Sequence, residues 1–96
     1  MSLGFEWNDR KARTKLQKHG VDFVEAASVF SDPIARIFVD EGHSTGERRE
    51  IIIGHSSRKR LLLVCFTELK KERIRVISAR SATRREQHDY EDDVTH

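Results

Sequence analysis

The side chains best suited to proton transfer in this 96-residue sequence are a histidine and a glutamate four positions apart. His43 titrates near neutral pH, so it could donate or accept a proton. Glu47 could orient the imidazole or act as the base itself. The alternative is a loop histidine that hydrogen-bonds to the backbone or lies in solvent. The sequence leaves both interpretations open.

Several arginines could bind a phosphate group, because a guanidinium donates paired hydrogen bonds to two oxygens. The candidates are Arg48, Arg60, Arg75 and Arg80. Arg75 lies on the opposite face from the apolar residues of a strand pattern, and Arg80 follows that strand at the start of an expected helix. Each could instead be a structural ion-pair partner, as Arg80 could be for Glu86.

The net charge of +2 conceals a strong segregation of charge. Residues 8–20 hold five basic residues against one acidic residue, and residues 70–85 hold seven against one. This asymmetry predicts a face for nucleic-acid phosphate or an acidic partner, against the alternative of solubilising charge. Three lysines at helical spacing could neutralise phosphates of a backbone, namely Lys11, Lys15 and Lys18. His19 is explained as a cation in the last turn of their helix.

We expect an α+β fold in a single domain spanning residues 1–96, because so short a chain supports one core. A short strand at residues 5–7 should precede two helices, an antiparallel meander and a last helix. Helices are expected from residue 8 or 9 to 19, from 22 to the break at Asp32-Pro33, and from 81–83 past Tyr90. The meander strands are expected at residues 34–40, 49–54, 61–67 and 73–78. The third of these is apolar on both faces, which predicts a central strand covered by helices on one side.

Other features limit the class of protein. Cys65 is the only cysteine and lies in an apolar run, so a disulfide is impossible and an inert thiol is expected. The chain has no leader pattern and no run of 18 apolar residues, so we expect a cytoplasmic protein with no membrane contact. His43, His55 and Asp40 could converge on a metal ion, but no ligand spacing specifies one. We therefore expect no cofactor and no metal site.

Short motifs stand in a fixed order along nearly the whole chain. They include Phe5-Glu6-Trp7, Lys18-His19-Gly20-Val21, Asp32-Pro33, His43-Ser44, Glu47-Arg48, Ile53-Gly54 and Ile77-Ser78-Ala79-Arg80. Together they resemble the BrnT family of ribonuclease toxins from bacterial toxin-antitoxin modules. The sequence departs from that family at Lys15, Lys59 and Leu69, where many members have Asn, Gly and Arg. If relatives use that Arg on the scissile phosphate, Arg73 or Arg75 would have to replace it here.

The resemblance implies a RelE-like fold and inhibition of translation by RNA cleavage. It also implies neutralisation by a BrnA-like antitoxin with a ribbon-helix-helix domain, a dimer within that complex, and binding of operator DNA only through it. The main alternative is a non-enzymatic RNA-binding or co-repressor subunit that acts through its antitoxin complex. A metal-dependent nuclease is a third hypothesis.

RNA can be cut without a metal ion because its own 2′-hydroxyl attacks the adjacent phosphorus and leaves a 2′,3′-cyclic phosphate. The enzyme must remove one proton, stabilise added negative charge and protonate the departing oxygen. The expected catalytic residues are His43, Glu47, Arg60, Arg75 and Arg80. The expected RNA-binding residues are Lys11, Lys15, Lys18, Arg48, His55, Arg84 and Tyr90. Tyr90 could stack on a base or simply pack beneath the last helix.

Overall fold

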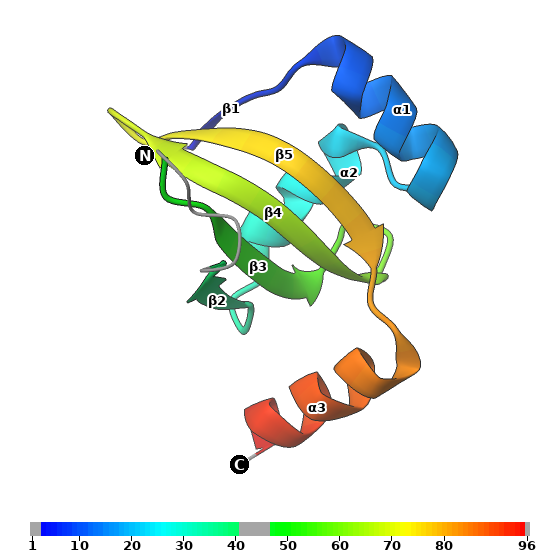
Figure 1. Cartoon of the computed structure of the whole chain (residues 1–96). Coiled ribbons are helices and arrows are strands. Elements are labelled where there is room, and N and C mark those ends of the chain that lie inside the picture. Colours follow the sequence, from blue (N-terminus) through cyan, green and yellow to red (C-terminus); the bar gives the residue numbers. More distant parts are fainter. Residues whose placement is uncertain (1–2, 41–46, 96) are drawn as a thin grey trace.

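A five-stranded mixed sheet organises the chain, as seen in a computed structural model that describes residues 3–40 and 47–95. The strand order is β1-β5-β4-β3-β2 (Figure 1). The elements in chain order are β1 (Gly4–Glu6), α1 (Asp9–His19), α2 (Phe23–Ser28), the 3₁₀ turn η1 (Val29–Ser31), β2 (Arg36–Val39), β3 (Glu50–His55), β4 (Leu61–Leu69), β5 (Arg73–Ser81) and α3 (Arg84–Thr95). None of the helices in these ranges has the length and apolar character needed to span a membrane.

The helices begin and end at the capping residues that the sequence indicates. The side chain of Asn8 accepts a hydrogen bond from the Lys11 backbone N–H, and Gly20 ends α1 in the left-handed conformation with φ of 72°. Asp22 caps α2 through the Glu25 N–H at 2.7 Å. The second helix is shorter than predicted, because α2 stops at Ser28 and the chain tightens into η1 before reaching Pro33.

Strands β2 to β5 form the predicted antiparallel meander. The sequence predicts a short N-terminal strand without assigning it a partner; in the structure β1 pairs in parallel with β5, so the sheet is mixed and has a fifth strand. Phe5 lies opposite Ile74 in this pairing, and its ring packs on Phe30 at 5.3 Å between centroids. Burial of this aromatic side chain gives a physical reason for β1 to join the sheet edge.

Strand ends also differ from the prediction by one to three residues, and two of these differences have a visible cause. β5 continues to Ser81, because residues past the register shift at Cys65/Phe66 keep pairing with β4 as far as Leu62↔Ser81. β2 begins later than expected, since the Ile34 N–H donates to the Asp32 carboxylate in a turn rather than to a strand.

The core lies between α2, η1 and one face of the sheet. Val64 and Phe66 of the central strand β4 pack there against Phe23 and Val29. In Figure 1 α2 lies behind the sheet, α1 lies beside β5, and α3 stands off from the end of β5. The opposite face of the sheet is therefore open in its middle, as the sequence predicts for a strand covered on one side.

Candidate active site

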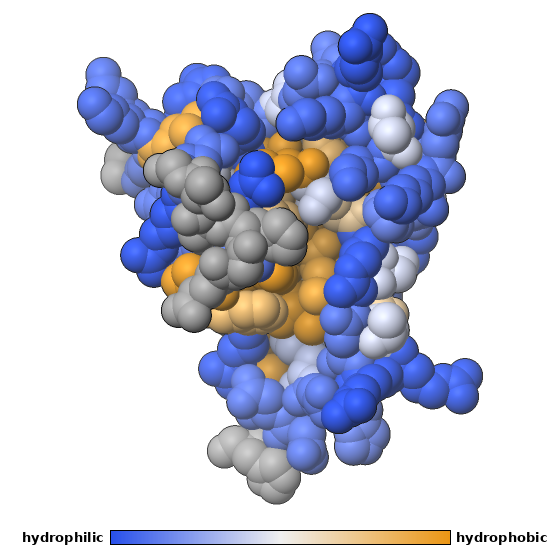
Figure 2. All heavy atoms as spheres, viewed as in Figure 1, coloured by the Kyte–Doolittle hydropathy of each residue, from blue (hydrophilic) through white to orange (hydrophobic). Residues whose placement is uncertain are grey.

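The open face of the sheet carries a pocket of about 450 Å³ with an apolar floor. Ile51 of β3 and Leu63 and Cys65 of β4 form this floor. Figure 2 shows apolar side chains gathered in the middle of this face between hydrophilic margins. Burial, followed by the nearby Asp40 carboxylate, raises the pKa of the Cys65 thiol, which is therefore protonated at neutral pH.

The rim of the pocket is basic. Lys15 and His19 reach the rim from α1. This helix packs against β5, whose first residues pair with β1. These two residues are four positions apart and so share one face of the helix. Arg49 and Arg80 complete the basic lining, and Asp40 is the acidic residue among those described. A half-enclosed site with this charge balance attracts a phosphate group.

The surroundings of His19 lower the pKa of its imidazole. Burial lowers its pKa from the ordinary 6.5, and the positive charges of Lys18, Lys15 and Arg80 lower it further. An imidazole with a pKa below 6.5 is mostly unprotonated at pH 7 and can accept a proton. The pocket thus joins an imidazole of lowered pKa to cationic side chains of the kind that bind phosphate oxygens.

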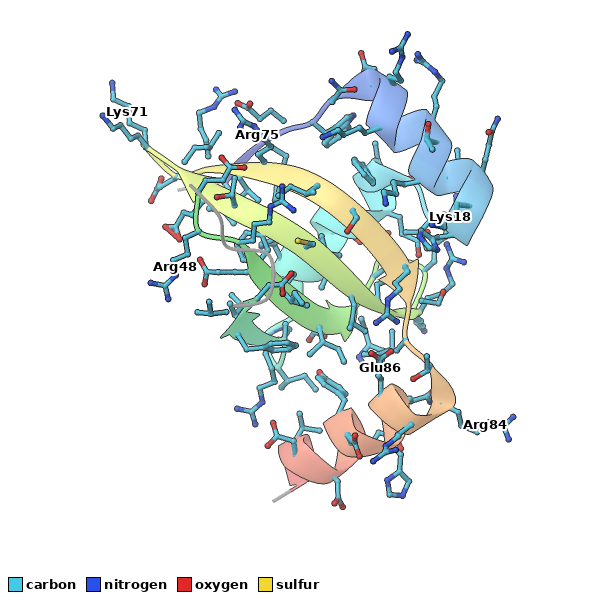
Figure 3. All side chains as sticks on the ribbon, viewed as in Figure 1. Lys18, Arg48, Lys71, Arg75, Arg84 and Glu86 are labelled. Carbon is cyan, nitrogen blue, oxygen red and sulfur yellow. The ribbon has the colours of Figure 1, made fainter. Side chains whose placement is uncertain are left out.

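Arg80 is bound by Glu86 through both oxygens, with Nη1–Oε1 at 2.7 Å and Nη2–Oε2 at 2.8 Å. Glu86 also accepts from the Thr83 N–H, while the Thr83 hydroxyl accepts from the Glu86 N–H. Figure 3 shows Glu86 between α3 and the end of β5. The structure therefore places Arg80 in the ion pair that the sequence left open and at the pocket rim at once.

The tie to Arg80 lowers the pKa of Glu86 to about 2, mainly through the Arg80 hydrogen bonds. Because this folded pKa lies below the unfolded value of about 4.5, ionised Glu86 stabilises the fold above pH 4.5 and loses that effect as the pH falls toward 2. We expect Glu86→Gln to be roughly 1–2 kcal/mol less stable at pH 7. Its urea midpoint should also fall less than that of the unmodified chain between pH 4.5 and 2. Equal losses in both proteins over this range would contradict the assignment.

Arg75 and Glu47, two other predicted catalytic residues, lie together and do not line the pocket. Arg75 contacts Glu6 at 3.3 Å and Glu47 at 3.6 Å. Arg73 donates to the same Glu6 at 3.0 Å, and its hydrogen bond is the largest cause of the lowered pKa of Glu6. Arg75 thus belongs to a cluster with two carboxylates, and Glu47 lies beside an arginine. His43, the expected partner of Glu47, lies outside the described residues.

Arg60 lies away from the pocket, where it binds the buried carboxylate of Glu25 on α2. Its Nε donates to Glu25 at 2.9 Å, its Nη2 donates to the other oxygen of Glu25, and the same Nη2 reaches the Gly20 carbonyl at 3.1 Å. The Ser56 hydroxyl also donates to Glu25, which is only 4% exposed. Arg60 therefore joins the β3–β4 loop to the junction of α1 and α2, and it does not line the pocket.

The predicted RNA-binding residues are spread over several margins. Lys15 alone of them lines the pocket; Lys11, Lys18, Arg48 and Arg84 are exposed elsewhere. Figure 3 shows Lys18 near the end of α1, with Arg48 and Arg84 at different margins.

His55 and Tyr90 form a separate contact beneath α3. Their rings are 5.8 Å apart, and the His55 Nδ1 lies 3.6 Å from the Asp32 carboxylate. The Tyr90 hydroxyl donates to the Ile34 carbonyl, and the residue is 4% exposed. This geometry fits packing beneath the last helix better than stacking on a base.

His19 and Arg49 line the pocket, but the sequence interpretation did not name them as site residues. Its explanation of His19 as a last-turn cation overlooked the four-residue spacing from Lys15, which puts both on one side of α1. Arg49 offers no comparable signal, because only the folded sheet brings it into the lining of the same pocket as Arg80.

Fold and pocket together define a small α+β domain with a pocket of basic rim and apolar floor on the open face of its sheet. The model of the family described as "Ribonuclease toxin, BrnT, of type II toxin-antitoxin system" matches residues 7–86. The chain belongs to this BrnT family, which confirms the resemblance, and family membership implies an antitoxin partner and an RNA substrate.

The structure is similar to the crystal structure of the Brucella abortus ribonuclease toxin, BrnT. The TM-score is 0.65 at 27% sequence identity, and the match covers 86% of this chain and 100% of that chain. A comparison with curated proteins finds no match.

Proposed function

We propose that this chain is a metal-independent endoribonuclease that cuts RNA at the pocket on the open face. The observation that carries the proposal is the meeting of a histidine of lowered pKa with Lys15, Arg49 and Arg80 over an apolar floor. The cations supply the electrostatic stabilisation that a divalent ion would otherwise provide, and they disfavour binding of such an ion in the pocket. Family membership supports ribonuclease activity as the class of reaction.

In the proposed reaction His19 removes the proton of the ribose 2′-hydroxyl, whose oxygen attacks the adjacent phosphorus. Lys15 and Arg80 stabilise the negative charge that builds up on the phosphate oxygens. The bond to the 5′-oxygen breaks, and that oxygen takes up a proton. The products are a 2′,3′-cyclic phosphate and a 5′-hydroxyl. Proton transfer by a positioned side chain contributes about 10² to 10⁴ to such a rate.

His43 is the proposed acid that protonates the departing oxygen. It follows Asp40, which lines the pocket, by three positions. Glu47, Arg60 and Arg75 remain predicted catalytic residues, but their carboxylate or arginine partners favour structural roles.

The broader setting is proposed by analogy with the family. We propose a cytoplasmic protein with a RelE-like fold, a BrnA-like ribbon-helix-helix antitoxin, operator DNA bound only through that complex, and a dimer within it. The basic pocket rim would then have two ligands, RNA and an acidic segment of the antitoxin.

The test is incubation of the purified chain with RNA in EDTA, followed by analysis of the ends produced. We expect new 5′-hydroxyl ends and 2′,3′-cyclic phosphates, and loss of both on addition of the antitoxin. Cutting that stops in EDTA would instead favour the metal-dependent alternative. RNA binding without any new ends would favour the non-enzymatic subunit.

The pH dependence of cleavage should report the pKa of His19. Because its base form is needed, kcat/KM should fall with acid below pH 6.5, following the lowered pKa. Lys15→Gln removes one of the charges that lower this pKa, so the titration midpoint of the His19 ring in NMR should rise toward 6.5. Glu68→Gln on β4 is a control that leaves the pocket lining unchanged. An unchanged His19 midpoint in Lys15→Gln would show that the two side chains do not interact.

A further inference from the structure

A groove of about 290 Å³ lies beside the pocket, between α3 and the open face of the sheet. Phe38, Ile53 and Tyr90 are among its apolar lining residues. Leu63 lines both the groove and the basic pocket, so the two depressions are contiguous. Figure 2 shows the apolar surface continuing across this face toward α3. A ligand held in the pocket can therefore extend into the groove.

The charge of the lining reverses between the two depressions. Where the pocket has a basic rim, the groove is bordered by α3 carboxylates, among them Asp89 and Asp93. Asp93 pairs with Arg36 at 3.3 Å. Asp89 makes no hydrogen bond or ion pair with the other residues that the structure describes. A free carboxylate at an apolar groove repels phosphate and accepts hydrogen bonds from N–H donors.

We propose that this groove binds the guanine base of the nucleotide whose phosphate occupies the basic pocket. The proposal rests on the proposed function for the phosphate position. Phe38 is 48% exposed as a residue, and its aromatic ring offers a surface for stacking. Among the four bases only guanine has two adjacent N–H donors on its Watson–Crick edge, which match the two oxygens of Asp89.

The spacing along β3 fits this arrangement. Ile51 lines the pocket and Ile53 lines the groove. Residues two apart on a strand face the same side and lie about 6–7 Å from each other. That separation is comparable to the distance between a phosphate and the base of the same nucleotide. The two isoleucines therefore report separately on the phosphate and the base.

Methyl NMR of the full chain with labelled isoleucine tests the proposal, with guanosine 3′-monophosphate and uridine 3′-monophosphate as probes. We expect the guanosine probe to shift both Ile51 and Ile53, and the uridine probe to shift chiefly Ile51. Asp89→Asn should weaken binding of the guanosine probe roughly 5- to 150-fold and leave the uridine probe unaffected. Asp92→Asn removes the same charge from α3 outside the groove lining and should change neither.

The proposal is wrong if Ile53 does not respond to the guanosine probe, or if Asp89→Asn binds it as tightly as the unmodified chain does. It is also wrong if Ile53 responds to the antitoxin but to neither nucleotide, since the groove would then be a protein-docking surface. Mapping of cleavage sites separates this failure from that of the nuclease proposal. A chain that cuts RNA with no preference for guanine lacks the base site; one that binds guanosine at Ile53 but never cuts RNA keeps the site and lacks the activity.

Discussion

Replacement of His19 by alanine is expected to reduce the rate of RNA cleavage by about 10² to 10⁴ while the chain remains folded. The histidine lies at the pocket rim, and burial together with neighbouring cations lowers the pKa of its imidazole, whose neutral form would take the proton. Removal of the ring leaves the cations that bind phosphate, so KM should change much less than kcat. Single-turnover cleavage of a short RNA measures the chemical step directly.

The matched control is His88→Ala, because His88 is exposed on α3 and lines none of the depressions described above. It should cleave at the rate of the unmodified chain. If His19→Ala is as active as this control, His19 is not the base. Loss of activity in His43→Ala alone would then assign proton removal to the residue that the sequence favours.

Arg60→Ala is expected to lower the free energy of unfolding clearly more than a surface substitution does, because it leaves the buried carboxylate of Glu25 without its main partner. The pKa of Glu25 is held below its ordinary value chiefly by the Arg60 hydrogen bonds, against burial, which alone would raise it. Urea unfolding at pH 7 gives the measurement. Arg58→Ala changes an exposed arginine of the same loop and should stay within about 0.5 kcal/mol.

A double variant separates a structural role of Arg60 from a catalytic one. If the ion pair is structural, Glu25→Gln combined with Arg60→Ala should recover part of the lost stability, since the stranded charge is gone. If Arg60 acts on the phosphate, Arg60→Ala should be nearly as stable as Arg58→Ala but unable to cut RNA. That result would restore the catalytic role predicted from the sequence.

Local signals in the sequence predicted most of the fold. Asn8, Asp22 and Thr83 act as helix caps through side chains that contact backbone groups three positions away, so a short window contains the whole interaction. The pairing of β1 with β5 could not be predicted in this way. It joins Gly4 to Arg73, and no feature of either short segment specifies the other.

The same limit applies to the candidate site. The sequence identifies arginines suited to phosphate, but their carboxylate partners depend on the tertiary structure: Glu6 and Arg73 are 67 positions apart, and Glu25 and Arg60 are 35 apart. Arg80 and Glu86 are only six apart, and here the alternative of an ion pair was visible from the sequence. The placement of Lys15 and His19 on the open face follows from how α1 lies against β5, which helical periodicity does not determine.

The two interactions of Glu86 link the basic pocket to the last helix thermodynamically. One carboxylate both closes the first turn of α3 and binds Arg80. If a ligand that binds Arg80 also weakens that turn, a partner that stabilises the turn must weaken the binding of the ligand by the same free energy. A partner that slows amide hydrogen exchange at the start of α3 should therefore also weaken RNA binding. Exchange at this helix would then report on occupancy of the pocket from outside it.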